Sequence, residues 1–253
     1  MVNGLKRVLA TDIDGTLVGH GGEDHFIRFV HEHPGLAVVY LTGRTRHNAE
    51  AVIRRYGFPP PIAMATEVGA EIYWGKHMAS DDIWAFQLRQ DWSPRKVRKT
   101  LEALPGVFYR SRSSHWRLAF SVDGEDVVEI VRHRLRRERV QARVLFDPSD
   151  GRLDVLPARA QKCRALSHIL TRVAVRPRQC FVAGDGENDR DLMQGRFPGV
   201  VVANAVHALR DLQGESVWLS RHPGAMGVVE GLRRWYAEFE GGEAKADALQ
   251  FYG

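Results

Sequence analysis

Residues 8–18 constrain the fold most, because an apolar run there ends in two carboxylates, Asp12 and Asp14, followed by a Gly-Thr turn. In a strand, residues two apart lie on one face, so both carboxylates are expected to point the same way if the strand continues through them. Two neighbouring negative charges are costly unless a cation lies between them or one binds a proton. The segment therefore predicts a buried strand that ends at a metal site.

Strand and helix patterns alternate along the first 80 residues. Continuous apolar runs are typical of strands covered on both faces, and the amphipathic segments between them are typical of helices. Strands are predicted over residues 7–11, 36–41 and 62–65, with helices over 23–33 and 44–56. This βαβαβ order predicts a parallel sheet with right-handed crossovers.

The pattern changes in the middle of the chain. A helix begins at Ser93-Pro94, where the serine can cap it and the proline suits its first position. Two strands follow over 107–112 and 116–122, then a helix over 125–139 and strands over 142–146 and 153–156. Two αββ units in succession predict a separate small domain with an antiparallel sheet.

The βα pattern returns after residue 160, and a last helix is predicted over 226–239, followed by a tail over 241–253. We therefore predict an α/β fold: a Rossmann-like parallel-sheet core, residues 1–80 and 158–253, with an inserted α+β (αββαββ) cap, residues 81–157. With 253 residues, 44% of them hydrophobic, the chain is long enough to bury such a core.

The positive charge of the chain is concentrated in the predicted cap. The net charge is +5, and between Arg89 and Arg143 there are 14 Lys and Arg against 7 Asp and Glu. Such a block attracts anions, which include phosphorylated metabolites, nucleic acids and anionic surfaces. The run over residues 132–139 could contact nucleic acid, but a solvated helix face is the default interpretation, and neither a helix-turn-helix nor an aromatic RNA-binding motif accompanies it.

Three further segments carry residues suited to phosphate chemistry, and each follows a predicted core strand or begins a helix. Thr42-Gly43-Arg44 offers a hydroxyl and a backbone N–H to a phosphate, although Thr42 could instead cap the next helix. Lys162 could neutralise carboxylates and hold a phosphoryl group, or lie on the surface. The loop 184–189 offers oxygen ligands that suit Mg²⁺, in residue types that also favour turns.

The order of these four motifs resembles that of the haloacid dehalogenase-like phosphohydrolases, whose motifs are DxDxT, a Ser or Thr, a Lys, and GDxxND. The segments 41–45, 66–73, 154–157 and 222–227 resemble the sucrose-phosphate phosphatase family, and the likeness extends over about residues 5–235. Three segments depart from that family: Gln161-Lys162-Cys163 replaces Asn-Lys-Gly, Gly186-Glu187 replaces Ser-Gly, and Ala70 replaces a Ser or Thr.

The resemblance implies a Mg²⁺-dependent phosphatase that hydrolyses a sugar phosphate, most simply sucrose 6-phosphate, through an aspartyl-phosphate. It implies a nucleophile at Asp12 and an acid/base at Asp14. The remaining implied roles are catalysis by Thr42 and Lys162; metal binding by Asp12, Asp14, Asp185 and Asp189; phosphate binding by Thr42, Gly43, Lys162 and Asn188; and substrate binding by Arg44, Glu71, His115, Trp116 and Arg117. Trp116 could equally be a packed residue of the cap sheet.

Several alternatives stay open at this level. The substrate could be another glycosyl phosphate, such as mannosylfructose phosphate or a glycosyl-phosphoglycerate, and a sugar phosphomutase is a more distant reading. Outside the enzymes, the basic cap could bind nucleic acid, or the acids and lysine could form a phospho-acceptor signalling domain.

The cellular context is predicted from composition alone. Two cysteines, Cys163 and Cys180, make no disulfide framework, and no stretch is long and apolar enough for a membrane span. The first apolar run is cut at Asp12, so it is no signal peptide. We expect a cytoplasmic protein, a monomer or weak dimer, with a small phosphorylated sugar as partner and neither membrane nor nucleic acid.

Overall fold

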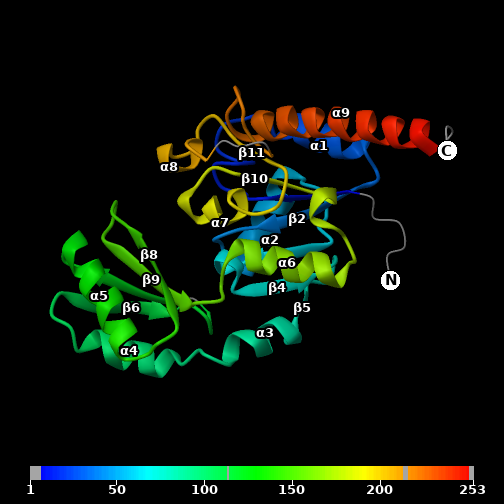
Figure 1. The fold of residues 1–253 in the computed structure, drawn as a ribbon. Helices are drawn as coiled ribbons and strands as arrows, with labels where there is room; N and C mark the ends of the chain where they lie inside the picture. Colours follow the sequence, from blue (N-terminus) through cyan, green and yellow to red (C-terminus); the bar gives the residue numbers. More distant parts are fainter. Residues whose placement is uncertain (1–6, 113, 213–215, 251–253) are drawn as a thin grey trace.

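The chain forms two β-sheets in a computed structural model, which describes residues 7–112, 114–212 and 216–250 (Figure 1). The larger sheet has eight strands in the order β12-β11-β10-β1-β2-β3-β4-β5. Its strands are β1 (Arg7–Thr11), β2 (Leu36–Leu41), β3 (Ala63–Thr66), β4 (Glu71–Trp74), β5 (Ala79–Ser80), β10 (Cys180–Gly184), β11 (Gly199–Val201) and β12 (Val217–Leu219).

The six strands from β12 to β3 are parallel, as the sequence predicts, but β4 and β5 extend the sheet with antiparallel pairing. A parallel crossover needs about a dozen residues or more, and only the short η1 (Glu67–Gly69) separates β3 from β4. The chain reverses there through three consecutive residues with positive φ: Glu67 at 50°, Val68 at 58° and Gly69 at 91°. The two antiparallel edge strands were not predicted.

Helices cover both faces of the large sheet. The buried side chains of α1 (Glu23–Glu32), α2 (Arg46–Tyr56) and α9 (Gly224–Gln250) form one apolar cluster with strand residues such as Leu9 and Val38. The side chains of α6 (Lys162–Arg172), α7 (Arg190–Met193) and α8 (His207–Arg210) join a second cluster that contains Val8 and Val39. Neighbouring strand residues thus enter opposite clusters, which explains the continuous apolar runs.

Two helix boundaries differ from the sequence prediction. Helix α2 begins at Arg46 and is capped by Thr45, whose hydroxyl accepts a hydrogen bond from the Asn48 N–H at 3.4 Å, so Thr42 is not its cap. Helix α9 continues to Gln250 where a tail was predicted. The residues after 242 include Ala, Glu, Lys and Leu, which have high helix propensity, and that propensity continues the last helix.

The second sheet has four antiparallel strands in the order β6-β7-β9-β8. The strands are β6 (Val107–Arg112), β7 (Leu118–Val122), β8 (Ala142–Asp147) and β9 (Arg152–Pro157), and they alternate in the chain with α4 (Pro94–Glu102) and α5 (Glu125–Arg137). Val97, Leu101 and Val131 of the helices are fully buried beside Phe120 and Leu153 of the sheet. The α/β class with an inserted αββαββ unit is confirmed.

Helix α3 (Asp82–Arg89), which was not predicted, connects the two sheets and lies on the core (Figure 1). Its cap residue, Asp81, accepts hydrogen bonds from the Trp84 N–H at 2.9 Å and the Trp74 indole at 2.7 Å. The Trp84 indole in turn donates to the Gly69 carbonyl at 3.1 Å. The domain boundary at residue 81 stays a prediction, and the helix that follows it contacts the core.

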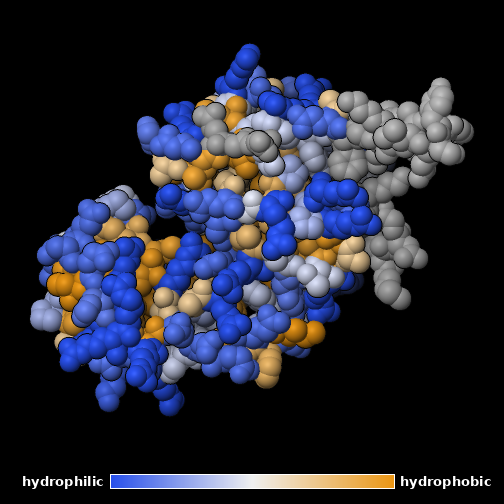
Figure 2. Space-filling model, in the orientation of Figure 1, coloured by the Kyte–Doolittle hydropathy of each residue, from blue (hydrophilic) through white to orange (hydrophobic). Residues whose placement is uncertain are grey.

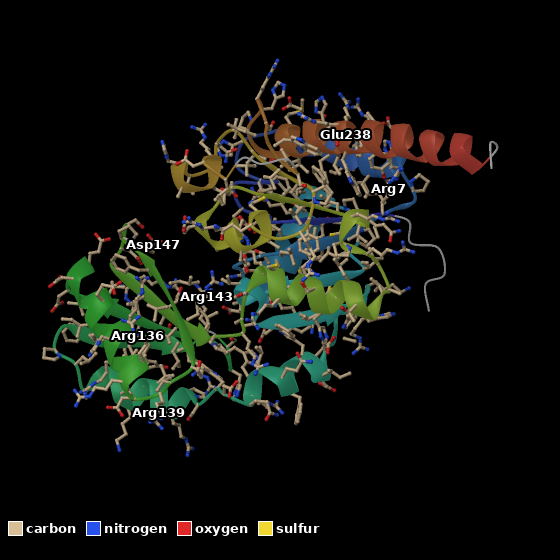
Figure 3. The ribbon with its side chains drawn as sticks, in the orientation of Figure 1. Arg7, Arg136, Arg139, Arg143, Asp147 and Glu238 are labelled. Carbon is tan, nitrogen blue, oxygen red and sulfur yellow. The ribbon has the colours of Figure 1, made fainter. Side chains whose placement is uncertain are left out.

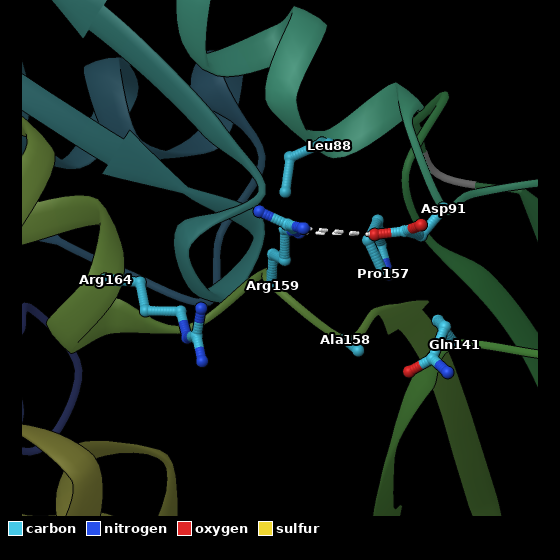
Figure 4. Close-up of a pocket in the computed structure, with 7 residues that line it drawn as sticks. All are labelled: Leu88, Asp91, Gln141, Pro157, Ala158, Arg159 and Arg164. Carbon is cyan, nitrogen blue, oxygen red and sulfur yellow. Dashed lines mark hydrogen bonds and ion pairs between the residues drawn. The ribbon is translucent and has the colours of Figure 1, made fainter.

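The two connections between core and cap pass side by side. Asp91 in the first connection forms an ion pair with Arg159 in the second at 3.3 Å (Figure 4). A pocket of about 280 Å³ lies beside this pair, between Leu88 and Pro157. Among the helices that the structure describes, none has the length and apolarity needed to cross a membrane.

Candidate active site

The candidate site lies where three neighbouring strands of the large sheet end. Strands β10, β1 and β2 are adjacent and parallel, so the loops after their carboxyl ends meet at one edge. These loops carry Asp185, Asp12 and Thr42, and ligands bind at such strand ends in open α/β sheets. Figure 2 shows the surface hollowed between the cap and the part of the core that bears α7 and α8.

Three carboxylates gather at this edge. One oxygen from each of Asp12, Asp185 and Asp189 lies within 4.8 Å of the others. Asp12 and Asp189 are buried, and Asp185 is partly buried. The Lys162 ammonium, fully buried at the start of α6, lies 3.0 Å from Asp12 Oδ2 and 2.7 Å from Asp189 Oδ1. The structure thus brings together four of the residues that the sequence proposed for catalysis and metal binding.

Burial dominates the electrostatics of this cluster. It raises the pKa of Asp12 above its ordinary value, although Lys162 opposes the rise, and repulsion from Asp189 adds to it. Burial also raises the pKa of Asp185, against a hydrogen bond from Thr16. For Lys162 burial lowers the pKa, but the charges of Asp12 and Asp189 outweigh that effect and raise it above its ordinary value. One lysine therefore does not neutralise the three acids.

The loop after β1 approaches Asp185 closely. The Thr16 hydroxyl donates to Asp185 Oδ1 at 2.6 Å. Gly15 has a φ of 74°, and a Cβ at that position would lie 2.1 Å from Asp185 Oδ2. The Gly-Thr pair of the first motif is thus needed both for its backbone conformation and for the space it leaves beside Asp185.

Asp14 has a different partner from Asp12, and the strand spacing that would align the two carboxylates does not extend to them. Strand β1 ends at Thr11, so the alternation that would align the two carboxylates stops before Asp12. The half-exposed Asp14 instead accepts two hydrogen bonds from Arg44, at 2.8 Å from Nε and 2.5 Å from Nη2. Its side chain is also absent from the group of acids described above.

The loop Thr42-Gly43-Arg44 lies beside this pair. Thr42 is fully buried, and its hydroxyl accepts a hydrogen bond from the Arg44 N–H at 3.1 Å. Asn188 approaches from the loop after β10, with its Nδ2 3.9 Å from where a Gly43 Cβ would lie. The buried Asn188 Oδ1 has no hydrogen-bond partner among the described residues. Asn188 therefore retains an unused acceptor at the candidate phosphate site.

The predicted sugar-binding residues differ in how far they are available to a ligand. Trp116 is 5% exposed and packs in the apolar core, so the alternative reading of Trp116 as a packed residue is the one that the structure favours. His115 is exposed beside it and lies 2.6 Å from Arg112. Arg117 contacts protein groups of both the cap and the core. Glu71 accepts hydrogen bonds from Thr66 and Tyr73, at 3.1 and 3.0 Å.

Sequence reasoning missed two residues that organise the site. Asn204, after β11, donates to the Gly15 carbonyl at 2.9 Å and accepts from the Gly224 N–H at 2.8 Å, which ties the first motif to the start of α9. Glu67 is fully buried and forms an ion pair with Arg117. Glu67 lies in the segment 66–73, which resembles the family, but nothing in the sequence indicated that it pairs with Arg117. No sequence pattern pointed to a role for Asn204.

The acidic cluster fits a divalent cation. Its ligands are hard oxygen atoms, and two of the three acids have raised pKa values because their charges are buried and close together. A bound cation relieves that repulsion and holds the carboxylates in their charged form. The arrangement thus offers a buried nucleophilic carboxylate, a cation site and hydrogen-bond donors for an anion.

The sequence matches a family of sugar-phosphate phosphatases over almost its whole length. The model of the family described as sucrose-6F-phosphate phosphohydrolase matches residues 5–236. A mannosylfructose-phosphate phosphatase from Agrobacterium fabrum is 29% identical over 242 residues, which are 90% of this chain and 96% of that protein. A probable sucrose-phosphatase 3a from Arabidopsis thaliana is 28% identical over 91% of this chain, which spans 60% of the plant protein.

Solved structures share the fold. A sucrose-phosphatase from Synechocystis sp. PCC6803, determined with sucrose and phosphate, superposes with a TM-score of 0.81 at 24% identity, over 91% of this chain and 98% of that one. A haloacid dehalogenase-like hydrolase from Bacillus subtilis gives a TM-score of 0.68 at 17% identity, over 90% and 91% of the two chains. The likeness covers the core and the cap together.

Proposed function

Because the chain belongs to the sucrose-6F-phosphate phosphohydrolase family, a group of phosphatases that act on sugar phosphates, we propose that it hydrolyses sucrose 6-phosphate to sucrose and phosphate. The observation that carries the proposal is the buried Asp12 carboxylate, held 3.0 Å from Lys162 at the end of β1 and within 4.8 Å of two further acids. An aspartate in that setting can act as a nucleophile toward a phosphoryl group.

Asp12 attacks phosphorus in line in the proposed first step. A bond forms between an Asp12 oxygen and phosphorus while the bond to the sugar oxygen breaks, and that oxygen receives a proton from Asp14. In the second step Asp14 takes a proton from water, the water oxygen bonds to phosphorus, and the bond to Asp12 breaks. Because Arg44 binds Asp14 through two hydrogen bonds, we expect this contact to open before Asp14 donates its proton.

Asp12, Asp185 and Asp189, with the Asp14 carbonyl, are proposed to hold Mg²⁺. The ion would neutralise phosphoryl charge and keep the Asp12 carboxylate ionised. Thr16 and Gly15 support the proposal, because the hydroxyl orients Asp185 and the glycine leaves room for it.

Thr42, the Gly43 N–H, Lys162 and Asn188 are proposed to hold the non-bridging phosphate oxygens. Thr42 and Lys162 are fully buried, so their hydrogen bonds would form in a site shielded from water, where charge stabilisation is strong. Arg44, Glu71 and His115 remain candidates for contact with the sugar, whereas the buried Trp116 and the protein-bound Arg117 are better suited to supporting the cap.

A second substrate, mannosylfructose phosphate, is favoured by one specific observation. The match with the phosphatase from Agrobacterium fabrum that is named for this compound covers 96% of that protein, whereas the match with the probable sucrose-phosphatase 3a from Arabidopsis thaliana covers 60% of the plant protein. Both compounds are phosphorylated disaccharides, so the same core chemistry serves either one.

Phosphate release from a panel of sugar phosphates tests the proposal. With Mg²⁺ present, the wild type should release phosphate faster from sucrose 6-phosphate than from mannosylfructose phosphate, glucosyl-3-phosphoglycerate or glucose 6-phosphate. Faster release from mannosylfructose phosphate would select the second candidate. Release from none of them, together with a salt-dependent gel shift of DNA or RNA, would replace the enzyme by the nucleic-acid-binding alternative.

A further inference from the structure

Arg117 belongs to the cap, but its side chain contacts the core. It lies immediately before β7, yet its Nη1 donates to the Gly43 carbonyl at 3.0 Å and to Glu67 Oε2 at 2.9 Å, both in the core. Its Nη2 donates to Asp154 of the cap strand β9. The Arg117 side chain is 15% exposed and that of Glu67 is 0% exposed, so this bridge lies inside the molecule.

Glu67 is held in place by an unusual backbone. Both Glu67 and Val68 have left-handed φ values, which are costly for any residue with a side chain and most of all for a β-branched one. The turn is stabilised by two hydrogen bonds, from the Glu67 N–H to the Arg44 carbonyl and from the Val68 N–H to the Thr42 carbonyl, each 3.0 Å long. The strained turn therefore rests on the candidate phosphate loop.

All three carbonyls of that loop accept hydrogen bonds from outside it. Thr42 and Arg44 receive the N–H groups of the strained turn, and Gly43, between them, receives Arg117 from the cap. The same Arg117 also binds the carboxylate of Glu67 in the turn. One cap residue thus contacts the phosphate loop directly and the turn beneath it.

We infer that Arg117 is a positioning residue: it fastens the cap to the core and sets the backbone of the phosphate loop Thr42-Gly43-Arg44, instead of contacting the sugar. The inference rests on the proposed function in taking that loop as the phosphate site. It revises the sugar-binding role that the family resemblance implied, because both Nη1 hydrogens are donated to the core and Nη2 donates to Asp154 of the cap.

The geometry couples cap closure to phosphate binding. Moving the cap away would separate Arg117 from Glu67 and remove a donor from the Gly43 carbonyl. The loop would then lose a contact at its central residue, Gly43, whose own N–H is proposed to bind phosphate. Arg44, the next residue, donates two hydrogen bonds to Asp14, so the same movement would also shift the partner of the proposed acid/base.

The test compares Arg117→Met with Arg152→Met. Arg152 is a matched control because it pairs with the same carboxylate, Asp154, at 3.1 Å but is half-exposed and has no core acceptor among its recorded bonds. Two quantities are measured for each full-length variant: the dissociation constant of inorganic phosphate with Mg²⁺ by calorimetry, and the radius of gyration by small-angle X-ray scattering.

Arg117→Met should weaken phosphate binding by roughly tenfold, the loss expected when a charge-assisted hydrogen bond that orders a site is removed. It should also enlarge the radius of gyration, while Arg152→Met changes neither quantity. Glu67→Gln should act in the same direction, and the double variant should be no worse than Arg117→Met alone. Unchanged phosphate affinity with a raised KM for the sugar phosphate would overturn the inference and restore a sugar contact.

Arg117→Lys covers the case in which Arg117→Met fails to fold. The lysine keeps a cation between Glu67 and Asp154 but loses the planar fork that reaches several acceptors, so an intermediate loss of phosphate affinity is expected. Wild-type affinity in Arg117→Lys would contradict the inference. Failure of the proposed function is distinguishable: the wild type would then release no phosphate from any sugar phosphate, while the differences in phosphate affinity and radius of gyration between the variants would remain.

Discussion

Asp12 and Asp14 are two residues apart and serve different partners. Asp12 faces Lys162 in a buried cluster, whereas Asp14 is half-exposed and faces Arg44. A nucleophile is held best in a rigid, charged environment, and a proton shuttle needs access to solvent and freedom to change partners. The two environments therefore match the two proposed roles, provided that the contact between Arg44 and Asp14 opens during turnover.

Asp12→Asn removes the nucleophile while keeping the size of the side chain. We expect turnover to fall by at least about 10³-fold, because an amide cannot form the acyl-phosphate. The thermal midpoint without metal should stay the same or rise, since one of three crowded buried charges is removed. Steady-state phosphate release and thermal unfolding measure both effects, and near wild-type turnover would contradict the mechanism.

The raised pKa values of Asp12 and Asp185 make stability depend on pH and on the cation. A carboxyl whose pKa is higher in the folded chain binds more protons there, so without metal it lowers stability as the pH rises above about 4, the value in the unfolded chain. Mg²⁺ should therefore raise the thermal midpoint at pH 8 and progressively less toward pH 5. Asp185→Asn should lose most of that shift, and a shift of equal size at both pH values would contradict the assignment.

At the scale of single residues, the sequence was informative where a residue follows a strand and uninformative where partners come from elsewhere. Asp12, Thr42 and Asp185 follow strands of the parallel sheet, and parallel pairing brings them to one edge, where Lys162 joins them from the start of α6. The Arg117–Glu67 pair joins residues 50 positions apart in two domains, and no local pattern encodes such a contact. Only the family resemblance pointed to Arg117, and it implied substrate binding, whereas the structure shows contacts with Gly43 and Glu67.

At the scale of elements, helix α3 is the clearest example of a structure that the sequence did not predict. It is short and has apolar side chains on more than one face, so the sequence shows no amphipathic pattern there, and the structure identifies Asp81 as its cap. The large parallel strands were predictable because burial on both faces leaves continuous apolar runs. Strands β4 and β5 were not, because β4 is mostly half-buried and both residues of β5 are exposed, so neither has a continuous apolar run.

Asp81→Ala should destabilise the protein by about 2–4 kcal/mol, since it removes a helix cap and leaves the Trp74 and His168 donors near it without an acceptor. Burial raises the pKa of Asp81, but hydrogen bonds from Trp84, Trp74 and His168 lower it below its ordinary value. Its stabilising effect is therefore present above about pH 4 and is lost as the pH falls further.

Urea unfolding of the wild type and Asp81→Ala at pH 7 and pH 3 measures that effect. The difference in unfolding free energy should shrink at pH 3. A variant with wild-type stability at pH 7 would show that α3 does not depend on this carboxylate.

At the scale of the whole molecule, the basic helix α5 of the cap and the candidate active site lie apart. Arg136 and Arg139 lie on the side of the cap turned away from the core, whereas Arg143 lies between the cap and the core (Figure 3). Arg143 donates to the Ala160 carbonyl at 3.2 Å, in the second connection to the core. The basic helix α5 therefore does not line the candidate active site.

This separation predicts how the chain behaves toward nucleic acid. Contacts made only by an exposed basic helix face are screened by salt, so any gel shift seen at about 50 mM salt should disappear by about 200 mM. The same salt change should leave sugar-phosphate turnover within about twofold, because the proposed nucleophile Asp12 and the adjacent Lys162 are buried. Sequence-selective binding that survives at the higher salt would contradict this account.

Asp12 is proposed to carry the phosphoryl group during turnover. The most direct test quenches the wild-type protein during turnover of sucrose 6-phosphate with Mg²⁺, reduces it with borohydride and maps it by mass spectrometry. An acyl-phosphate at Asp12 is reduced to homoserine, so the account predicts homoserine at position 12 and nowhere else, and only when substrate is present. Phosphate release without homoserine at position 12, or with the modification at another carboxylate, would contradict it.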